Sequence, residues 1–190
     1  ESYFTFYDQT AGIGKADFMA ASKKGVLPTP NSVSMVFKHM MTKLVVNVEN
    51  QSGAEIVSVG IDGTPKATGF DLVNMTLTDF EGPLTEEEPD PVMAYEAVAG
   101  KTWQAIVIPH SNAMSIVITL SSKKVLTQSL AAMTLKSGGQ YTVNARVLPD
   151  NVEVTATGEI LNWTDEGYLA FEGEAEKEYT PVTFEEFEGY

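Results

Sequence analysis

Cysteine is absent from this chain of 190 residues. Without a thiol the protein has no disulfide, no thiolate zinc site, no iron–sulfur ligation and no thiol catalysis. Basic residues are scarce, because 12 Lys and Arg stand against 26 Asp and Glu, for a formal net charge of -14 at pH 7. A chain this acidic repels the phosphate backbone of nucleic acids, so we expect no nucleic-acid partner.

Long apolar runs are also missing. No stretch approaches the roughly 20 apolar residues of a membrane helix, and the first residues, Glu1-Ser2-Tyr3, do not resemble the start of a signal peptide. The length fits one large domain, or one domain and a fragment of another. A chain of this size buries roughly 70% of the surface that its unfolded form exposes, so a hydrophobic core can hold it together without cross-links.

The sequence contains no recognisable catalytic arrangement. Its only histidines are His39 and His110, which we interpret as structural, and no serine lies in a Gly-x-Ser-x-Gly turn. The number of acidic residues is compatible with the paired carboxylates of a glycosidase. Most of these residues, however, lie in a loop and a tail, where the burial that raises the pKa of a catalytic carboxyl is not expected. The spaced Asp-x-Asp-x-Asp-Gly calcium loop is absent. We predict no enzymatic activity, no cofactor and no metal.

Alternation of apolar and polar residues dominates the chain, and this period of two is typical of half-buried strands. Five segments rich in Val, Ile and Thr show it: residues 57–61, 103–107, 116–120, 141–147 and 152–156. Turn-forming residues separate these segments, as in Asp62-Gly63-Thr64-Pro65. The pattern predicts an all-β, antiparallel β-sandwich.

Two segments near the N-terminus depart from simple alternation. Residues 17–22 predict a helix of one or two turns, with Asp17 as the N-terminal cap. In residues 32–49 the apolar positions change phase, from Val33, Met35 and Phe37 to the opposite parity. A strand cannot keep one face buried through such a change, so we predict a bulge or bend within residues 38–43.

Other segments are unlike a sheet. Residues 86–91, with three glutamates and two prolines, predict a solvated loop. From Glu172 onward the chain is dominated by glutamate, so this tail is either disordered or becomes ordered when it binds a partner. Trp103 and Trp163 lie at the ends of alternating segments, where we predict that they pack over the rim of the core.

Several short motifs, in order along the chain, resemble those of one family. Residues 36–46 are similar to the F-x-H-x-x-S/T-K-aliphatic strand of the fimbrillins of Bacteroidales (type V pilus), with the motif residues Phe37, His39 and Lys43. Residues 106–109 resemble the family's I-V-I-P-Q strand, with Pro109 conforming and His110 standing where the family often has Gln. Tyr141 and Trp163 match the closing G-x-x-Y and I-x-x-W motifs.

The resemblance implies a transthyretin-like β-sandwich and a structural or adhesive pilus subunit that assembles by β-strand exchange. It implies export as a lipoprotein from an upstream signal, and a place at the cell surface, in the outer membrane or the fimbrium. Partners would be other pilus subunits or the chain itself, by strand addition, and a host or bacterial surface ligand. We expect an N-terminal segment or remnant of a preceding domain at 1–31, the sandwich at 32–171, and the acidic tail at 172–190.

The tail offers spaced apolar residues that could anchor an exchanged strand. These candidate anchors are Tyr179, Val182, Phe184, Phe187 and Tyr190. The alternative is that residues 168–171 complete the sandwich and the remainder is a disordered end. A second functional hypothesis also stays open, namely a glycan-binding surface module whose loops hold an aromatic platform.

Overall fold

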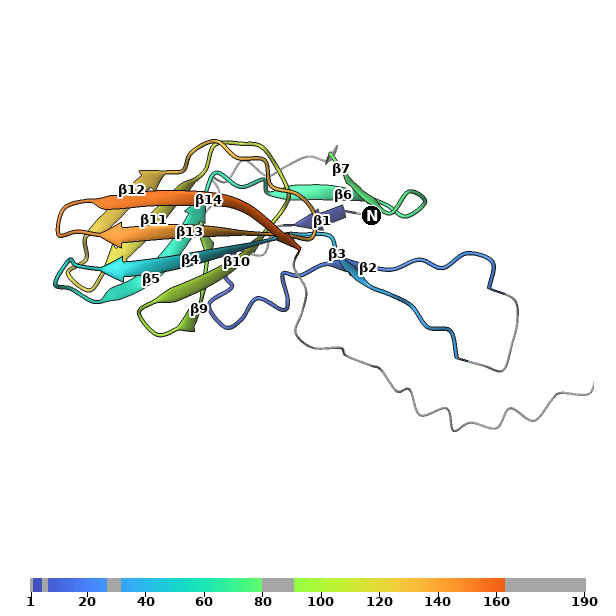
Figure 1. The fold of residues 1–190 in the computed structure, drawn as a ribbon, viewed down its shortest axis with the longest axis horizontal. Coiled ribbons are helices and arrows are strands. Elements are labelled where there is room, and N and C mark those ends of the chain that lie inside the picture. The colour runs from blue at the N-terminus through green and yellow to red at the C-terminus, as the bar shows by residue number, and fades with distance from the viewer. Residues whose placement is uncertain (1, 5–6, 27–31, 80–90, 163–190) are drawn as a thin grey trace, which may run out of the picture.

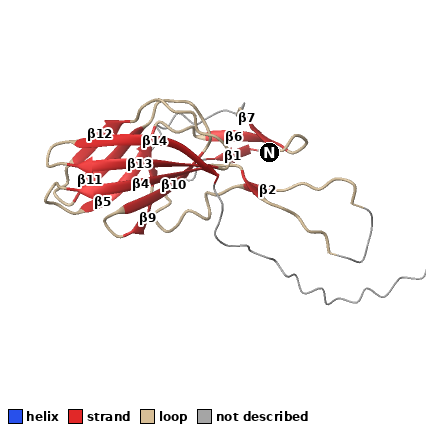
Figure 2. Ribbon diagram, viewed as in Figure 1, coloured by secondary structure: helices blue, strands red, loops and turns tan. Residues whose placement is uncertain are grey.

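The computed structural model describes residues 2–4, 7–26, 32–79 and 91–162. All regular secondary structure within these residues is β-strand (Figure 2). None of these residues therefore forms a helix long and apolar enough to cross a bilayer. The strands build an elongated sandwich, and the chain between β2 and β3 extends away from one end of it (Figure 1). The all-β sandwich expected from the sequence is confirmed.

The larger sheet has five strands in the order β14-β13-β4-β10-β9. Its members are β4 (Thr42–Asn50), β9 (Tyr95–Val98), β10 (Thr102–Val107), β13 (Gly139–Val147) and β14 (Val152–Asn162). Neighbouring strands are antiparallel except β13 and β4, which run parallel with Tyr141 opposite Leu44. A parallel pair needs a long crossover, and here the chain passes through the second sheet between the two strands.

The second sheet has four antiparallel strands in the order β12-β11-β5-β8. They are β5 (Ile56–Asp62), β8 (Val92–Met93), β11 (Ser115–Leu120) and β12 (Val125–Ser129). One expected inward residue, Val57, is 65% exposed. The ladder explains this difference, because Thr119 pairs with Ser58 and Leu120 with Ile56, which leaves Val57 as the extra residue of a bulge.

The core lies between the two main sheets and is built by alternate residues of each strand. Its fully buried members include Leu44, Val46, Val59, Ile61, Val107, Ile116, Ile118, Val143 and Val147. Trp103 is only 2% exposed and belongs to this cluster, which confirms its predicted place in the core. Each large aliphatic side chain that is fully buried contributes about 1.5–3 kcal/mol, so this cluster supplies most of the driving force for folding.

Two small sheets lie beside the sandwich. One has the order β1-β6-β7 and consists of β1 (Ser2–Phe4), β6 (Ala67–Asp71) and β7 (Thr76–Thr78). The other is the antiparallel pair β2 (Met19–Ala20) and β3 (Lys38–His39). The two meet in a minor apolar cluster of Ala20, Met40 and Phe70, so the two small sheets pack against each other.

The short helix predicted at residues 17–22 is wrong, because Met19 and Ala20 form β2. The Asp17 carboxylate contacts Nδ1 of His39 at 2.8 Å instead of capping a helix. The Phe18 ring meets the edge of Phe70 with 4.8 Å between ring centroids. A helix of one or two turns is only marginally stable by itself, so these tertiary contacts decide the conformation.

The predicted break in residues 32–49 is confirmed, since β3 ends at His39 and β4 begins at Thr42. After the break, alternate residues of β4 are buried as expected. Before it the expectation fails, because residues 32–37 form no strand and Val33, Met35 and Phe37 are 42–57% exposed. The loop at 86–90 and the tail lie outside the described residues, and the domain limits stay a prediction.

Candidate functional site

One edge of the sandwich is closed by the start of the chain. At this edge the chain changes sheets, because β8 pairs with β5 of the second sheet and β9 pairs with β10 of the larger one. Residues 7–9 run parallel to Met93 of β8. The Met93 amide donates to the Tyr7 carbonyl at 2.6 Å, and the Gln9 amide donates to the Met93 carbonyl at 3.0 Å. The backbone of β8 is therefore covered on both sides.

The side chain of Gln9 closes the neighbouring strand β10. Beyond Gln104, which pairs with Tyr95, β9 no longer accompanies β10. There Gln9 Nε2 donates to the Ile106 carbonyl at 2.7 Å, and the Ile106 amide donates to Gln9 Oε1 at 2.8 Å. Gln9 is fully buried. Its amide thus makes the two bonds that a strand backbone would make, so the backbone of β10 is closed at Ile106.

A tight turn holds Gln9 in place. The amide and the hydroxyl of Thr10 both donate to Oδ1 of Asp8, at 3.1 and 2.6 Å, and the Gly12 amide donates to the Gln9 carbonyl. The side-chain and then the backbone bond from Thr10 lower the pKa of the exposed Asp8 carboxyl, because both favour its charged form. In the sequence, Asp8 and Gln9 resemble the family's linker before the F-x-H strand, but no pattern assigned Gln9 a pairing role, since a single glutamine in a polar turn resembles any surface residue.

The residues that follow cover the outer side of β10. Ile13, Ala16 and Phe18 pack against a small buried cluster of Met41, Ile106 and Ile108. The contact between Asp17 and His39 lies beside this cluster, with side chains 13% and 7% exposed. His39, a motif residue of the sequence analysis, therefore ties the N-terminal segment to the base of β3.

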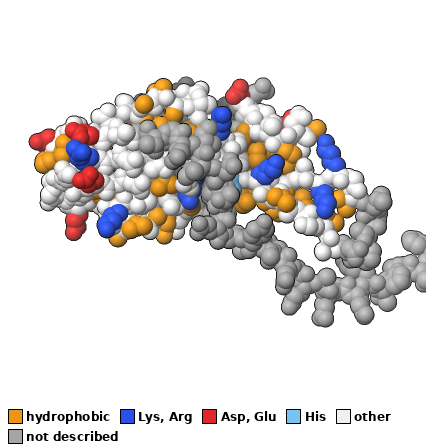
Figure 3. Space-filling model, in the orientation of Figure 1, with side chains coloured by type: hydrophobic (Ala, Val, Ile, Leu, Met, Phe, Trp, Pro, Cys, Tyr) orange, Lys and Arg blue, Asp and Glu red, His pale blue; other side chains and the backbone are white. Residues whose placement is uncertain are grey.

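Beyond β2 and β3 lies an extended arm, which we define as an outgoing leg, residues 21–26, and a returning leg, residues 32–37. The legs begin side by side at the paired strands β2 and β3 and then diverge as they extend away from the sandwich (Figure 1). In the described chain, residues 33–36 make no backbone-to-backbone hydrogen bond, and the Lys23 ammonium donates to the Ser34 carbonyl at 3.1 Å. Hydrophobic and Lys side chains are both exposed at this end (Figure 3).

The exposed residues of the returning leg are large and apolar. Val33, Met35 and Phe37 alternate along it and are 42%, 44% and 57% exposed, while Val36 on the other side is 78% exposed. An extended segment outside any sheet, with alternating exposed apolar side chains, is a template for strand addition. Phe37, a motif residue, is thus part of this template and not of the core.

The remaining motif residues have structural positions. The Tyr141 ring is buried, and its hydroxyl donates to the Thr134 carbonyl at 2.8 Å and accepts from the Lys136 amide at 3.1 Å. Lys43 and Pro109 are half-buried at the start of β4 and just after β10. Trp163 and the five candidate anchors of the tail lie outside the described residues.

His110 follows Pro109 in a turn. Its Nδ1 accepts from the Asn112 amide at 3.0 Å, and its buried Nε2 has no hydrogen-bond partner in the described chain. Burial lowers the pKa of His110 below its ordinary value of 6.5, because the imidazolium form would lose its hydration. The imidazole is therefore a neutral structural group at neutral pH.

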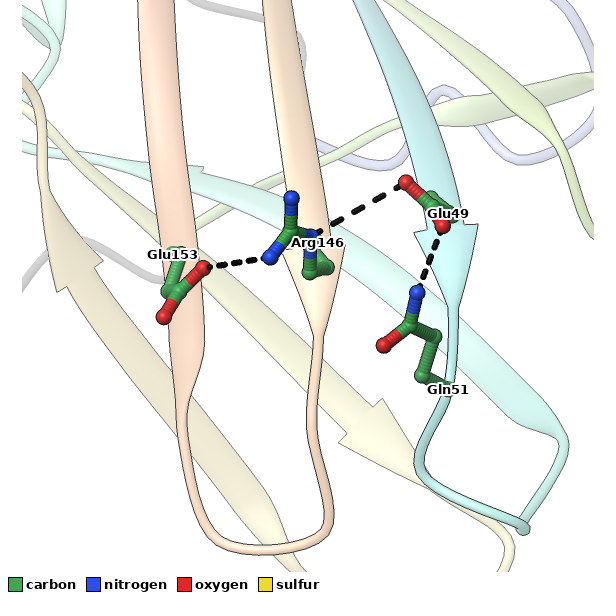
Figure 4. A network of polar contacts seen from close by, with 4 residues as sticks. All are labelled: Glu49, Gln51, Arg146 and Glu153. Atoms are coloured by element: carbon green, nitrogen blue, oxygen red, sulfur yellow. Dashed lines mark hydrogen bonds and ion pairs between the residues drawn. The ribbon is translucent and has the colours of Figure 1, made fainter.

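A shallow polar hollow lies on the outer face of the larger sheet. Asn47 donates to Asn144 at 3.3 Å, and Thr102 donates to Asn47 at 3.2 Å, so amides and a hydroxyl form a row across β13, β4 and β10. At one end of the hollow Arg146 lies between Glu153, at 3.3 Å, and Glu49, at 3.9 Å, with Gln51 on the far side of Glu49 (Figure 4). Among its described lining residues there is no aromatic ring and no group of metal ligands.

A model of the fimbrillin-like family matches residues 2–163. The chain belongs to this family. The resemblance found in the sequence motifs is confirmed by a match to almost the whole described length. A comparison with curated proteins found no match.

Solved structures share the fold of this fimbrillin-like chain. A candidate cell adhesion protein from Bacteroides uniformis has a TM-score of 0.62 at 18% identity, over 86% of this chain and 66% of that one. Another from Bacteroides ovatus has a TM-score of 0.56 at 20% identity, over 71% and 49%. The tip fimbrial protein Mfa3 from Porphyromonas gingivalis also matches, at 12% identity over 64% and 51%, with a TM-score of 0.43. This chain therefore spans less than two thirds of the length of these neighbours.

Proposed function

We propose that this fimbrillin-like chain is a structural or adhesive subunit of a surface fimbrium that assembles by β-strand exchange. The observation that carries the proposal is the returning leg of the arm, because it belongs to no strand among the described residues and exposes alternating apolar side chains. Backbone bonds to an added strand provide affinity, and the side chains Val33, Met35 and Phe37 provide specificity. The backbone of β10 is already closed at Ile106 by Gln9, which favours the arm over β10 as the place of addition.

The donor in this proposal is the tail of another copy or of another pilus subunit. Its candidate anchors are Tyr179, Val182, Phe184, Phe187 and Tyr190. The proposed location is the cell surface, in the outer membrane or fimbrium, after an upstream lipoprotein signal has been removed. We propose no catalytic role, in line with a family and structural neighbours that are fimbrial or cell adhesion proteins.

An unboiled denaturing gel of the purified protein, run with and without limited trypsin, tests strand exchange. Exchanged strands bury a continuous backbone ladder, so we expect a ladder of oligomers that collapses on heating. A single monomer band under all conditions would contradict exchange between copies of this chain. That outcome would favour a tip subunit that caps the filament, or the glycan-binding alternative.

The glycan-binding alternative now has mixed support. The polar hollow offers the amide and hydroxyl groups that sugar hydroxyls bind. The expected aromatic platform is not found there, since Trp103 is buried in the core and no aromatic residue lines the hollow among the described residues. We therefore keep this function as the second candidate.

A further inference from the structure

The arm combines the exposed apolar side chains of its returning leg with lysines on its outgoing leg and at its base, a charge opposite to that of the molecule. From residue 18 to residue 48 the chain contains no acidic residue, although its overall net charge is -14. Lys23, Lys24 and Lys38, all exposed, lie on the arm or at its base. An arm that is apolar on one leg and basic within an acidic protein favours an acidic, apolar strand.

The acidic tail of the same chain has these properties. Residues 172–190 contain seven glutamates and one lysine. Val182 and Phe184 alternate around Thr183, with Glu185 and Glu186 directly after them. A strand over residues 180–186 would place its two apolar side chains on one side, which matches the alternation of Val33, Met35 and Phe37.

The tail also starts at the correct end of the sandwich. The last described residue of β14, Asn162, is opposite Gly139 of β13. Next to Gly139, the Gly138 amide donates to the carbonyl of Met41, which lies between β3 and β4 at the base of the arm. Each ten residues of extended chain span about 33 Å. The chain that follows Asn162 is therefore long enough to bring residues 180–186 beside the returning leg.

We propose that residues 180–186 of the acidic tail dock along the returning leg of their own chain as an added strand. The docked strand covers Val33, Met35 and Phe37, and its glutamates face Lys23, Lys24 and Lys38. Two strands alone are marginally stable, whereas three with an apolar face can persist, so the docked strand would extend the antiparallel pair β2 and β3 along the returning leg. This docking goes beyond strand exchange and does not require it.

Cysteine pairs test the docking, because the natural chain has no cysteine to interfere. The variant Ser34→Cys with Thr183→Cys places one thiol on the returning leg and one on the tail. The control, Ser122→Cys with Thr183→Cys, places the first thiol at an exposed turn between β11 and β12. Both are made in the full chain and oxidised mildly at low protein concentration, and the disulfide is followed as a fast-migrating monomer on a non-reducing gel.

We expect the monomeric disulfide to form about tenfold faster in the Ser34 pair than in the Ser122 pair, because docking raises the local concentration of the thiols. Equal rates would overturn the docking. Covalent dimers in place of monomers would overturn docking within one chain and would support exchange between copies. In a further outcome, the natural protein forms a ladder of oligomers on the unboiled gel while the Ser34 pair shows no faster disulfide than the Ser122 pair. That result would support strand exchange and overturn the docking, so the two proposals can fail separately.

The charges of the arm provide a second readout. Adding Lys23→Glu and Lys24→Glu to the Ser34 pair should slow the disulfide severalfold at low salt and much less at 0.5 M salt, since surface charges are screened. Lys101→Glu and Lys123→Glu change the net charge equally at sites off the arm and should leave the rate unchanged. Equal slowing by both pairs of substitutions would contradict recognition of the tail by the arm.

Discussion

At the scale of single residues, His110 shows how burial sets the chemistry of a side chain. Its Nδ1 accepts one backbone hydrogen bond, and its Nε2 is buried without a partner in the described chain. Burial lowers its pKa from 6.5, so the unfolded chain takes up a proton there before the folded protein does. The contribution of His110 to stability is therefore complete above about pH 6.5 and is lost as the pH falls through the folded-state pKa.

We predict that His110→Gln reduces the loss of stability on acidification. A glutamine carbonyl can still accept from the Asn112 amide but does not titrate. Urea unfolding of both proteins at pH 7.5, 6.0 and 5.0 measures the effect, and the other ionisable groups are the same in both. If the stability of the two proteins falls in parallel, His110 is not buried as the structure indicates.

At the scale of elements, residues 7–9 act as a short strand that depends on one side chain. Gln9 makes two hydrogen bonds to Ile106 at a place where β10 has no neighbouring strand. Asp8 and Thr10 form the turn that orients the Gln9 side chain toward β10. Because a buried backbone group without a partner costs about 1–3 kcal/mol, the segment and β10 stabilise each other through this amide.

We predict that Gln9→Leu lowers the free energy of unfolding by about 2–4 kcal/mol, since it leaves the Ile106 amide and carbonyl buried without partners. Gln51→Leu is the matched control, because Gln51 is exposed and its amide donates to Glu49 on the surface. We expect the control to change stability by less than about 0.5 kcal/mol. Similar losses in the two variants, measured by urea unfolding, would show that Gln9 does not close the edge.

At the scale of the whole molecule, we expect the sandwich and the acidic tail to have separate roles. The described core lies between the two main sheets and is built by residues of the chain from β4 to β14. The proposed assembly, in contrast, requires the tail. Stability and self-association should therefore respond differently when the tail is removed.

We predict that a chain ending at residue 171 unfolds at nearly the same urea concentration as the full chain but forms no ladder on an unboiled gel. The core that holds the sandwich is intact in both chains, whereas the proposed donor strand is lost. The full chain, purified and loaded in parallel, is the control. An unchanged ladder after truncation would contradict the tail as the donor.

Much of this fold was predictable from the sequence for a local reason. The period of two in residues 103–107, 116–120 and 141–147 reports which side of a strand is buried, and all three segments are strands with that burial. The phase change within 38–43 predicted the break before β4. The family motifs were also local, and the match to the fimbrillin-like family confirms the family that they indicated.

The sequence by itself determined the sandwich, its core and the family, because alternation and turn chemistry are properties of neighbouring residues. Only the tertiary structure decided where Val33, Met35 and Phe37 lie, since alternation is the same in a buried strand and in an exposed arm. It also shows strand β2 where a helix was expected at 17–22, and it shows that the Gln9 side chain pairs with the backbone of β10. These features depend on contacts between residues 22 to 97 positions apart, such as Asp17 with His39 and Gln9 with Ile106, and no local pattern records them.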